Sequence, residues 1–588
     1  MAEQPLQLTP RVVSATYWTP RRGGLQALVL VVVSAAFLGL GLWQAWTDAP
    51  TYDEPTYIAA GVVAVTAHDV TFDEEHPALG KALAALPVLL AHPVVPTGYR
   101  YMNEHQYSEL FTQAQLRAGK LRMVMLLSRL VPLLEAVAVG AVIFRLGCSL
   151  FGRRAGLLAA VLWLADPLTL GLAHVDGIDI PMALATVLLA WAFLGVLRQP
   201  TRLRLAVVGM ACGGVSLANE DGLGMAAVVA VVVVAAGWRI AGWRAIGRLI
   251  PVGGAAWATV AVSYAVFDPA SLLPYVVVPA PFVHGLQYLL TYDTRPSTGY
   301  LLGMSWTGGR WWYWPLSMAV KVPWATLAIL VGGSVACIRL TEPVRRQAMV
   351  AVALPAAVLA VELLQVKRDI GVRYVLPILA LWCILASPIA ERVADLRMPS
   401  AEDPMSPPAP RQPEPARAKG RVAVCLLVAL PGVALVQTVR SAPNSLAWVD
   451  PGLGPSYQVA SNSSLDWGQD FYVLRRWATV HRAFVASFGL DLTVADIPGA
   501  RPLLVHHGSQ LVSVDPRSIR GWVAVSASVL TAGGYPQLGW LRAYCPVGRL
   551  DGTILLYRFS EGAEEGPAPI TPAGLCPRGA ASSMLNGR

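Results

Sequence analysis

The chain has 588 residues, of which 55% are hydrophobic and only 14% are charged, and its mean hydropathy is +0.52. Soluble domains carry about 25% charged residues, so this composition excludes an ordinary soluble protein. The net charge of +9 does not indicate nucleic-acid binding, because the arginines recur in short groups between alternate apolar stretches, as the positive-inside rule describes for membrane proteins.

Apolar stretches that can cross a hydrocarbon core of about 30 Å recur along the chain. We expect an all-α polytopic membrane protein with about eleven transmembrane helices, at 25–46, 120–144, 155–172, 180–197, 205–219, 223–238, 246–267, 314–338, 347–365, 374–390 and 421–439. The fifth and sixth spans are the weakest, because Asn219, Glu220 and Asp221 lie where they meet. These three residues form either a turn at the surface or a polar break within one long element.

The charge pattern also predicts the topology. With residues 1–24 in the cytoplasm, every arginine group falls on the cytoplasmic side. The acidic motifs then lie on the extracytoplasmic side, together with two long loops at 47–119 and 268–313. We therefore expect a multi-pass protein of the plasma membrane whose active site faces outward.

The C-terminal third has a different composition. Residues 399–420 are rich in proline and charge, which predicts a disordered cytoplasmic linker before the last span at 421–439. Residues 440–588 contain no further span and carry alternating strand-like runs, so we expect a small extracytoplasmic α/β domain with its tail. Cys545 and Cys576 both lie there and can pair if the tail is in an oxidising compartment, although the sequence does not establish the pairing.

The first long loop begins with the acidic pair Asp53-Glu54, followed by Pro55 at the start of an expected helix. The pair comes soon after the first span, so it should lie at the membrane surface. Partial desolvation there raises the proton affinity of a carboxylate and makes it a better base. Tyr57 and His76 are expected in the same cavity, whereas the acids from Asp69 to Glu75 are interpreted as solvated turn residues.

The second external loop and a later part of the first loop also carry candidate ligands. The second external loop contributes Asp176 and Asp179, and two acids that converge with the first loop can activate a hydroxyl or hold a divalent ion. Lys81 lies alone in an apolar segment, 78–91, which we expect to lie in the interface plane. Its side chain either reaches the interface or contacts a phosphate.

Basic residues also occur on the outer face, against the positive-inside trend: Lys367, Arg368 and Arg373. A lipid phosphate is their natural ligand, because arginine binds phosphate in a bidentate manner. The aromatic run at 311–314 is interpreted as an interfacial belt, with stacking on a sugar as the alternative. No nucleotide-binding loop, dinucleotide fingerprint or thiolate zinc motif occurs, so no cofactor of those kinds is predicted.

Five stretches together resemble the membrane-embedded GT-C glycosyltransferases of the protein O-mannosyltransferase and aminoarabinose-transferase type, in their bacterial branch. They are "DEPTYIAAG" with "HPALGK", "GIDIP", "GYLLGMSWTGGRWWYWPLSMAVKVP", "GVRYVLP" and "SSLDWGQD". The resemblance implies a GT-C fold and an inverting glycosyltransferase that takes a sugar from a polyprenyl-phosphate donor. The acceptor would be a hydroxyl on a lipid, a polysaccharide or a protein.

The resemblance also implies roles for individual residues. Asp53, with Glu54 beside it, would be the catalytic base or orient the acceptor, and Asp179 would line the same cavity. Lys81 and Arg373, with Arg368, would bind the donor phosphate. No cofactor would be required, although a divalent metal between Asp53 and Asp179 is compatible with the pattern.

The sequence departs from the family pattern at three places. Ala78 stands where a second proline is usual, "ANEDG" replaces a span end that often carries a lysine, and the tail is not a β-trefoil. The main alternative function is a transporter or flippase for a lipid-linked or anionic solute, which would show ionisable residues near mid-span or repeated halves. A relative without transferase activity that binds the carrier is the third hypothesis.

Overall fold

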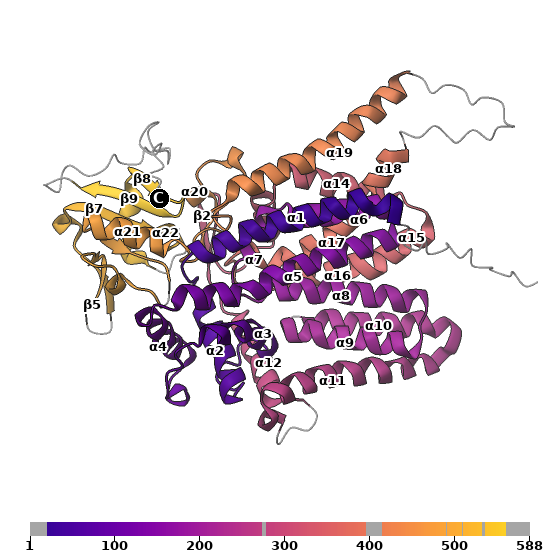
Figure 1. Cartoon of the computed structure of the whole chain (residues 1–588), viewed down its shortest axis with the longest axis horizontal. Coiled ribbons are helices and arrows are strands. Elements are labelled where there is room, and N and C mark those ends of the chain that lie inside the picture. Colours follow the sequence, from indigo (N-terminus) through magenta and orange to yellow (C-terminus); the bar gives the residue numbers. More distant parts are fainter. Residues whose placement is uncertain are drawn as a thin grey trace, which may run out of the picture.

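The computed structural model describes residues 20–220, 222–272, 278–395, 414–489, 491–507, 510–531 and 535–559. Long helices run side by side through most of the molecule, and the strands of the C-terminal region gather at one end of this bundle (Figure 1). The prediction of a helical polytopic protein with a small C-terminal α/β part is therefore confirmed.

Seven helical stretches in the described part of the chain are long and apolar enough to cross a membrane. Four lie within single helices: Gly24–Thr47 in α1 (Pro20–Thr47), α5 (Leu121–Leu150), α8 (Asp179–Arg198) and Val422–Ser441 in α19 (Glu414–Ser441). Three join consecutive elements: Gly242–Phe267 joins η3 (Gly242–Arg248) and α11 (Leu249–Phe267), Glu342–Leu363 joins α15 (Glu342–Ala348), η5 (Met349–Ala353) and α16 (Leu354–Leu363), and Val372–Ala394 joins η6 (Val372–Val375), α17 (Leu376–Ala386) and most of α18 (Ile389–Asp395). An eighth span is possible if α6 (Arg153–Leu164) and α7 (Pro167–Ala173), bent by 61°, are counted as one.

The predicted number of about eleven spans is not confirmed. The predicted spans at 205–219, 223–238 and 314–338 correspond to α9 (Arg202–Ala218), α10 (Gly222–Ala241), α13 (Tyr313–Lys321) and α14 (Trp324–Ile338), none of which is among the seven; Gly222–Trp238 within α10 and α14 are apolar but shorter than 18 residues. The chain breaks between α9 and α10 at Asn219 and Glu220, which are both buried. This break is thus a polar interruption inside the protein and not a surface turn, while Asp221 lies outside the described residues.

Small residues allow the helices to approach closely. A side chain at Gly147 of α5 would lie 2.8 Å from the Cα atom of Gly156 in α6, so these two helices touch backbone to backbone. Such contacts between small residues are a common way to pack helices in membranes.

The first long loop folds into α2 (Glu54–Ala67), α3 (Ala78–Val88), η1 (Leu89–Ala91), η2 (Tyr99–Tyr101) and α4 (Glu104–Arg117). Asp53 is the N-cap of α2 and Pro55 lies in its first turn, as predicted. A side chain at Gly61 of α2 would lie 2.1 Å from the carbonyl oxygen of Lys81, so α2 and α3 pack closely. The segment 78–91 therefore packs against protein at this face, and Lys81 is buried.

The second long loop contains η4 (Pro269–Leu272), α12 (Ala280–Tyr292) and a hairpin of β1 (Thr298–Leu301) and β2 (Met304–Thr307). The belt interpretation of the aromatic run is wrong for Tyr313 and Trp314, which are only 2% and 4% exposed, whereas Trp311 is 70% exposed. The Trp314 indole donates a hydrogen bond to the carbonyl oxygen of Leu363 and packs edge-on against Tyr374. These two aromatic side chains thus belong to the core.

The C-terminal region forms a five-stranded mixed sheet in the order β4 (Arg501–Pro502), β3 (Phe484–Ala486), β7 (Gly521–Ser526), β9 (Ile554–Phe559) and β8 (Gly548–Leu550). Strand β3 is parallel to β4 and β7, and β9 is antiparallel to β7 and β8. The other elements are the hairpin β5 (Leu504–His507) and β6 (Gln510–Ser513), the helices α20 (Ser456–Val459), α21 (Phe471–His481) and α22 (Ala527–Thr531), and the turns η7 (Pro451–Leu453), η8 (Asn462–Ser464), η9 (Val494–Asp496), η10 (Pro516–Ser518) and η11 (Pro536–Ala543).

Two predictions for this region fall partly outside the described residues. Helix α19 begins at Glu414, within the predicted linker, so residues 414–420 are helical, and 399–413 lie outside the described residues. Cys545 is buried, but Cys576 also lies outside them, so the pairing stays a prediction.

Basic loops and acidic motifs occupy opposite ends of the bundle. At one end, Arg198 donates to Ser149, Arg154 pairs with Glu391, and Arg392 donates to the carbonyl oxygen of Arg339. Helices α2, α3 and α4 lie at the other end, beside the strands (Figure 1). The separation of charges along the sequence is therefore a separation in space.

Candidate active site

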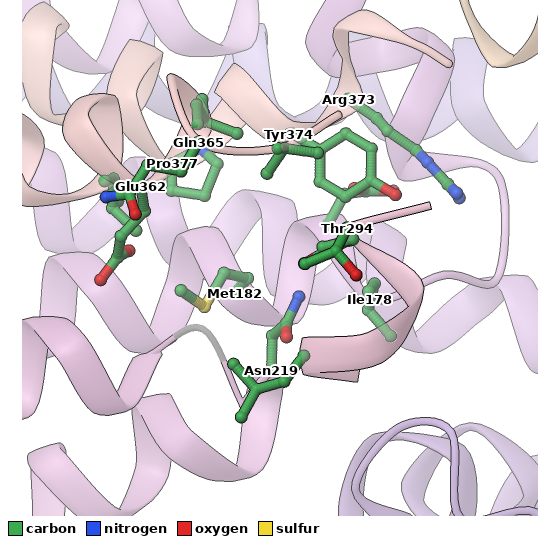
Figure 2. Close-up of a pocket in the computed structure, with 15 residues that line it drawn as sticks. Ile178, Met182, Asn219, Thr294, Glu362, Gln365, Arg373, Tyr374 and Pro377 are labelled. Atoms are coloured by element: carbon green, nitrogen blue, oxygen red, sulfur yellow. The ribbon is translucent and has the colours of Figure 1, made fainter. Parts of the chain in front are cut away.

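A cavity of about 280 Å³ lies at the start of α8, beside the acidic motif that contains Asp179. Its walls come from the start of α8, the break after α9, the end of α12, helix α16 and the segment η6–α17. The lining residues are Ile178, Asp179, Met182, Asn219, Leu290, Asp293, Thr294, Leu359, Glu362, Leu363, Gln365, Val366, Arg373, Tyr374 and Pro377. Figure 2 shows Arg373 and Glu362 at opposite ends, with Tyr374 between them.

Arg373 connects this cavity to the first loop. Its Nη1 atom donates a hydrogen bond of 2.9 Å to Oδ2 of Asp53, although the two residues are 320 positions apart. The Nε group of Arg373 is buried without a hydrogen-bond partner, and Oδ1 of Asp53 receives no hydrogen bond from the described residues. Nη2 of Arg373 makes no hydrogen bond to a described residue either, so the pair keeps donors on Arg373 and an acceptor on Asp53 for a ligand.

The ring of Trp467 positions Arg373. The guanidinium carbon lies 4.5 Å from the centre of this ring, and a cation–π contact shielded from water is worth about 2 kcal/mol. The backbone of the same loop holds the first loop, because Trp467 and Gln469 accept hydrogen bonds from the amides of Tyr52 and Ala49. Sequence reasoning used "SSLDWGQD" only as a family motif and missed this role, which the tryptophan beside two acids could have suggested.

The two serines of that motif hold the segment that carries Arg373. The Ser464 hydroxyl accepts a hydrogen bond from the amide of Val372, and the Ser463 hydroxyl donates one to the carbonyl oxygen of Ile370. Lys321, which the sequence analysis did not single out, donates to the backbone carbonyl oxygens of Leu446, Trp448 and Ser464. Buried hydrogen bonds thus fix the position of Arg373 from both sides.

Asp179 is the first residue of α8, is buried, and lines the cavity. It interacts electrostatically with Arg373, Asp53 and His76. The structure therefore brings together three of the predicted site residues: Asp53, Asp179 and Arg373.

Arg368 lies near the α12 side of the cavity but is engaged with an aromatic ring. Its guanidinium carbon is 3.7 Å from the centre of the Tyr292 ring, and Nη2 donates a hydrogen bond of 2.8 Å to the Tyr292 hydroxyl. Asp293, the next residue, lines the cavity. Burial raises the pKa of Asp293, and the charges of Arg368 and His76 oppose that rise.

Glu54 lies next to Asp53 but points into the protein. Nε and Nη2 of Arg129 donate to its two carboxylate oxygens at 2.7 Å each, and the amides of Thr51 and Asp176 donate at 2.8 Å. Burial raises the pKa of Glu54, but Arg129 and these hydrogen bonds outweigh it and keep the pKa below its ordinary value. In this arrangement Glu54 has a structural role, because it joins the first external loop to the second.

Asp176 is also buried away from the cavity, where it accepts a hydrogen bond from the Ser128 hydroxyl. Burial, opposed by that hydrogen bond, raises the pKa of Asp176 to about 8. Between about pH 4 and pH 8 the folded protein thus holds a proton that the unfolded chain releases. Stability should fall as the pH rises through this window.

The variant Asp176→Asn should therefore gain stability relative to the unsubstituted protein as the pH rises from 5 to 8. The expected gain is about 1 kcal/mol per pH unit, the linkage value for one proton. Thermal unfolding in detergent at several pH values measures it, with the exposed Asp515→Asn as control. If the difference in stability between the variant and the wild type does not change with pH, Asp176 is not held in its neutral form in the folded protein.

Lys81, predicted to bind phosphate, is paired within the first loop. Its Nζ atom donates to Oδ2 of Asp73 at 3.0 Å and to the carbonyl oxygen of the same residue at 2.8 Å, and both side chains are buried. In this arrangement Lys81 stabilises the turn before α3. Asp73 is accordingly a buried partner and not a solvated turn residue.

His76 and Tyr57 pack together behind Asp53. Their rings meet edge to face with centres 5.8 Å apart, and both side chains are buried. Burial raises the pKa of Tyr57 well above its ordinary value, and the charge of Asp53 adds to the rise. Nδ1 of His76 lies 3.9 Å from the buried carboxylate of Glu220, a residue that the sequence analysis noted only as part of a helix break.

A divalent metal was considered between Asp53 and Asp179. Within the described ranges, no group of three or more histidine, cysteine, aspartate or glutamate side chains is arranged to hold a metal ion. Arg373 already supplies the positive charge beside both carboxylates. The reaction proposed below therefore uses the charge of Arg373 and no metal.

Comparisons with known proteins return no matching family model and no matching curated protein. Among solved structures, ArnT from Cupriavidus metallidurans bound to undecaprenyl phosphate aligns with 91% of this chain and 98% of its own, at 14% identity and a TM-score of 0.45. The oligosaccharyltransferase AglB from Archaeoglobus fulgidus, in complex with an inhibitory peptide and a dolichol-phosphate, aligns over 91% and 74%, at 12% identity and a TM-score of 0.46. The protein O-mannosyltransferase Pmt1-Pmt2 complex of S. cerevisiae, bound to the sugar donor, aligns over 47% and 39%, at 13% identity and a TM-score of 0.31.

Proposed function

We propose that this chain is an inverting glycosyltransferase of the GT-C class, which moves a sugar from a polyprenyl-phosphate donor to a hydroxyl acceptor on the extracytoplasmic face of the plasma membrane. The observation that carries this proposal is the contact between Asp53 and Arg373 beside a cavity walled by apolar helices. A carboxylate that can accept a proton and a guanidinium that can bind a phosphate thus occur side by side. The arginine groups at the opposite end of the bundle support the outward orientation of this site.

The reaction needs only these two kinds of group. The acceptor hydroxyl attacks the anomeric carbon of the sugar from the face opposite the phosphate, and its proton passes to a carboxylate oxygen of Asp53. The bond between the anomeric carbon and the phosphate oxygen breaks, and both of its electrons leave with the polyprenyl phosphate. Arg373 stabilises the charge that develops on this leaving group, and Asp53 acts as the general base.

The cavity indicates the size of the transferred group. Its volume of about 280 Å³ lies at the lower limit of ligand pockets, which span about 300–1,000 Å³. This size favours a single hexose or pentose over an oligosaccharide. The acceptor can be a lipid, a polysaccharide or a protein, since each presents a hydroxyl group.

Incubation of the purified full-length protein with a panel of radiolabelled polyprenyl-phosphate sugars tests the proposal. We expect one donor to release free polyprenyl phosphate and to pass its label to an acceptor in a membrane extract. Reconstituted vesicles provide the comparison with a flippase. Movement of intact labelled donor across the bilayer, without cleavage of the sugar–phosphate bond by any panel member, would contradict the proposal.

A further inference from the structure

The cavity is short of positive charge for an anionic donor. It is lined by the carboxyl groups of Asp179, Asp293 and Glu362 and, among cationic residues, by Arg373 alone as far as the structure describes the chain. Arg373 is already bonded to Asp53. Of the other cations predicted for the phosphate, Lys81 is paired with Asp73, while Arg368 stacks on the uncharged Tyr292 and its charge already opposes that of Asp293. A phosphate at Arg373 would therefore meet an excess of negative groups.

The buried carboxylate of Glu220 requires a positive charge close to it. This residue is only 2% exposed, and neither of its carboxylate oxygens has a hydrogen-bond partner in the part of the chain that the structure describes. A buried carboxylate without a partner is costly unless a countercharge lies nearby. Nδ1 of His76, at 3.9 Å, is within ion-pair distance. An imidazolium at His76 supplies the countercharge that Glu220 requires.

The other nitrogen of His76 is available to a ligand. Nε2 makes no hydrogen bond to a described residue and, unlike Nδ1, is not one of the enclosed unpartnered atoms. The imidazole acts electrostatically on Asp179 and Asp293, two residues that line the cavity. Its ring edge also packs against Tyr57, which interacts electrostatically with Asp53 and Arg373. His76 thus contacts a buried acid, and although it does not itself line the cavity, its charge acts on two residues that do.

The surroundings of His76 favour its charged form. Burial lowers the pKa of His76, but Glu220 and Glu75 outweigh burial and raise the pKa above its ordinary value, against an opposing effect of Lys81. The titratable and charged groups around it come from all the elements packed there: Asp53 and Tyr57 at α2, Asp73, Glu74 and Glu75 in its own loop, Lys81 of α3, Asp179 of α8, Glu220 before α10, His284 and Asp293 of α12, and Arg373 of η6.

We propose that the Glu220–His76 pair is a second cationic element of the donor site, in which Glu220 holds His76 as an imidazolium and Nε2 of His76 donates a hydrogen bond to the lipid-linked phosphate. This inference rests on the proposed function and deepens it. It assigns to a histidine the neutralising role that the sequence pattern gave to Lys81. Glu220 is then a positioning residue, which acts on the donor only through His76.

Binding of undecaprenyl phosphate, without a sugar, to the full-length protein in detergent tests this assignment between pH 5.5 and pH 9. A hydrogen bond to a charged group is worth about 1.5–3 kcal/mol, so His76→Gln should bind about 10- to 100-fold more weakly at pH 6. The difference in affinity between the two proteins should shrink as the pH rises and His76 loses its proton. A phosphate monoester gains charge as the pH rises through about 6, so titration of the lipid cannot produce this convergence.

The variant Glu220→Gln tests whether Glu220 acts on the donor through His76 or only supports the structure in general. It should bind like the unsubstituted protein at pH 5.5 and more weakly at pH 7, because His76 then loses its proton at a lower pH. His284→Gln, at an exposed histidine of the same region, should bind within about twofold of wild type at every pH, since it leaves the charge-assisted bond in place. Thermal unfolding confirms that each variant is folded.

The possible outcomes distinguish the two proposals. If the unsubstituted protein binds the lipid phosphate and Arg373→Gln weakens binding, but both His76→Gln and Glu220→Gln match wild type at every pH, the role of His76 is wrong and the phosphate site stands. A loss that is equal at all pH values in both variants would also overturn the assignment. If the unsubstituted protein binds no lipid phosphate at any pH, the proposed function itself fails.

Discussion

Replacing Asp53 by asparagine should reduce sugar transfer by about 10²- to 10⁴-fold, the usual contribution of a general base, and should leave the protein folded. Asparagine keeps an oxygen that can accept the hydrogen bond from Arg373, but it cannot take a proton from the acceptor. The loss should therefore appear in the turnover number more than in donor binding. Initial rates with saturating donor and a thermal unfolding curve measure the two effects.

Asp69→Asn is the matched control, since it makes the same change in the same loop. Asp69 accepts hydrogen bonds from the amide and hydroxyl groups of Thr71 and from the Tyr99 hydroxyl, whereas Asp53 accepts its hydrogen bond from Arg373, which lines the cavity. This control should retain nearly full activity. Turnover by Asp53→Asn within a few-fold of wild type would exclude Asp53 as the base.

The neighbouring variant Glu54→Gln should instead cost stability, by about 3–5 kcal/mol, which is typical when one partner of a buried ion pair is removed. Glu54 and Arg129 are both fully buried, so the substitution leaves the guanidinium without its countercharge. Thermal unfolding in detergent measures the loss. We expect activity to fall only as far as the folded fraction falls.

Adding Arg129→Met to Glu54→Gln is the control for this interpretation. The double variant should recover part of the stability, because it buries no unpaired charge. Recovery should stay incomplete, since Arg129 also donates to the carbonyl oxygens of Ala45, Asp48 and Ala49. If Glu54→Gln unfolds like the wild type while turnover collapses, Glu54 belongs to the chemistry and not to the scaffold.

The contrast between Asp53 and Glu54 shows the limit of reading a motif. Both are acids at the start of one expected helix, and local sequence does not separate them. Successive residues in the first turn of a helix point about 100° apart, so one can face Arg373 at the edge of the cavity while the other faces the core. The partner across each interface decides which is which: Arg373 for Asp53 and Arg129 for Glu54.

The same reasoning explains the cations. Lys81 and Arg373 both looked suited to a phosphate, because each stands near the outer end of an apolar segment. Asp73, only eight residues before Lys81, binds it within the loop. Arg373 meets Asp53 and Trp467, which are distant in sequence. Lys81 thus has a partner close to it in sequence, whereas the partners of Arg373 are distant in sequence.

What the sequence by itself determined was the class of protein and the set of candidate residues. Length, apolar runs and arginine placement are properties of the chain as a whole, and they require a polytopic helical protein whatever its side chains contact. Helix α2, with Asp53 as its N-cap and Pro55 in its first turn, also follows from local chemistry.

Only the tertiary structure decided which candidates face the cavity. It joined Asp53 to Arg373 across 320 positions, placed Trp467 beneath the guanidinium, and gave His76 the buried partner Glu220. A charged side chain inside a protein takes its properties from the charges and the burial around it. Those surroundings come from helices and loops far apart in the chain, so they are defined only once the bundle has packed.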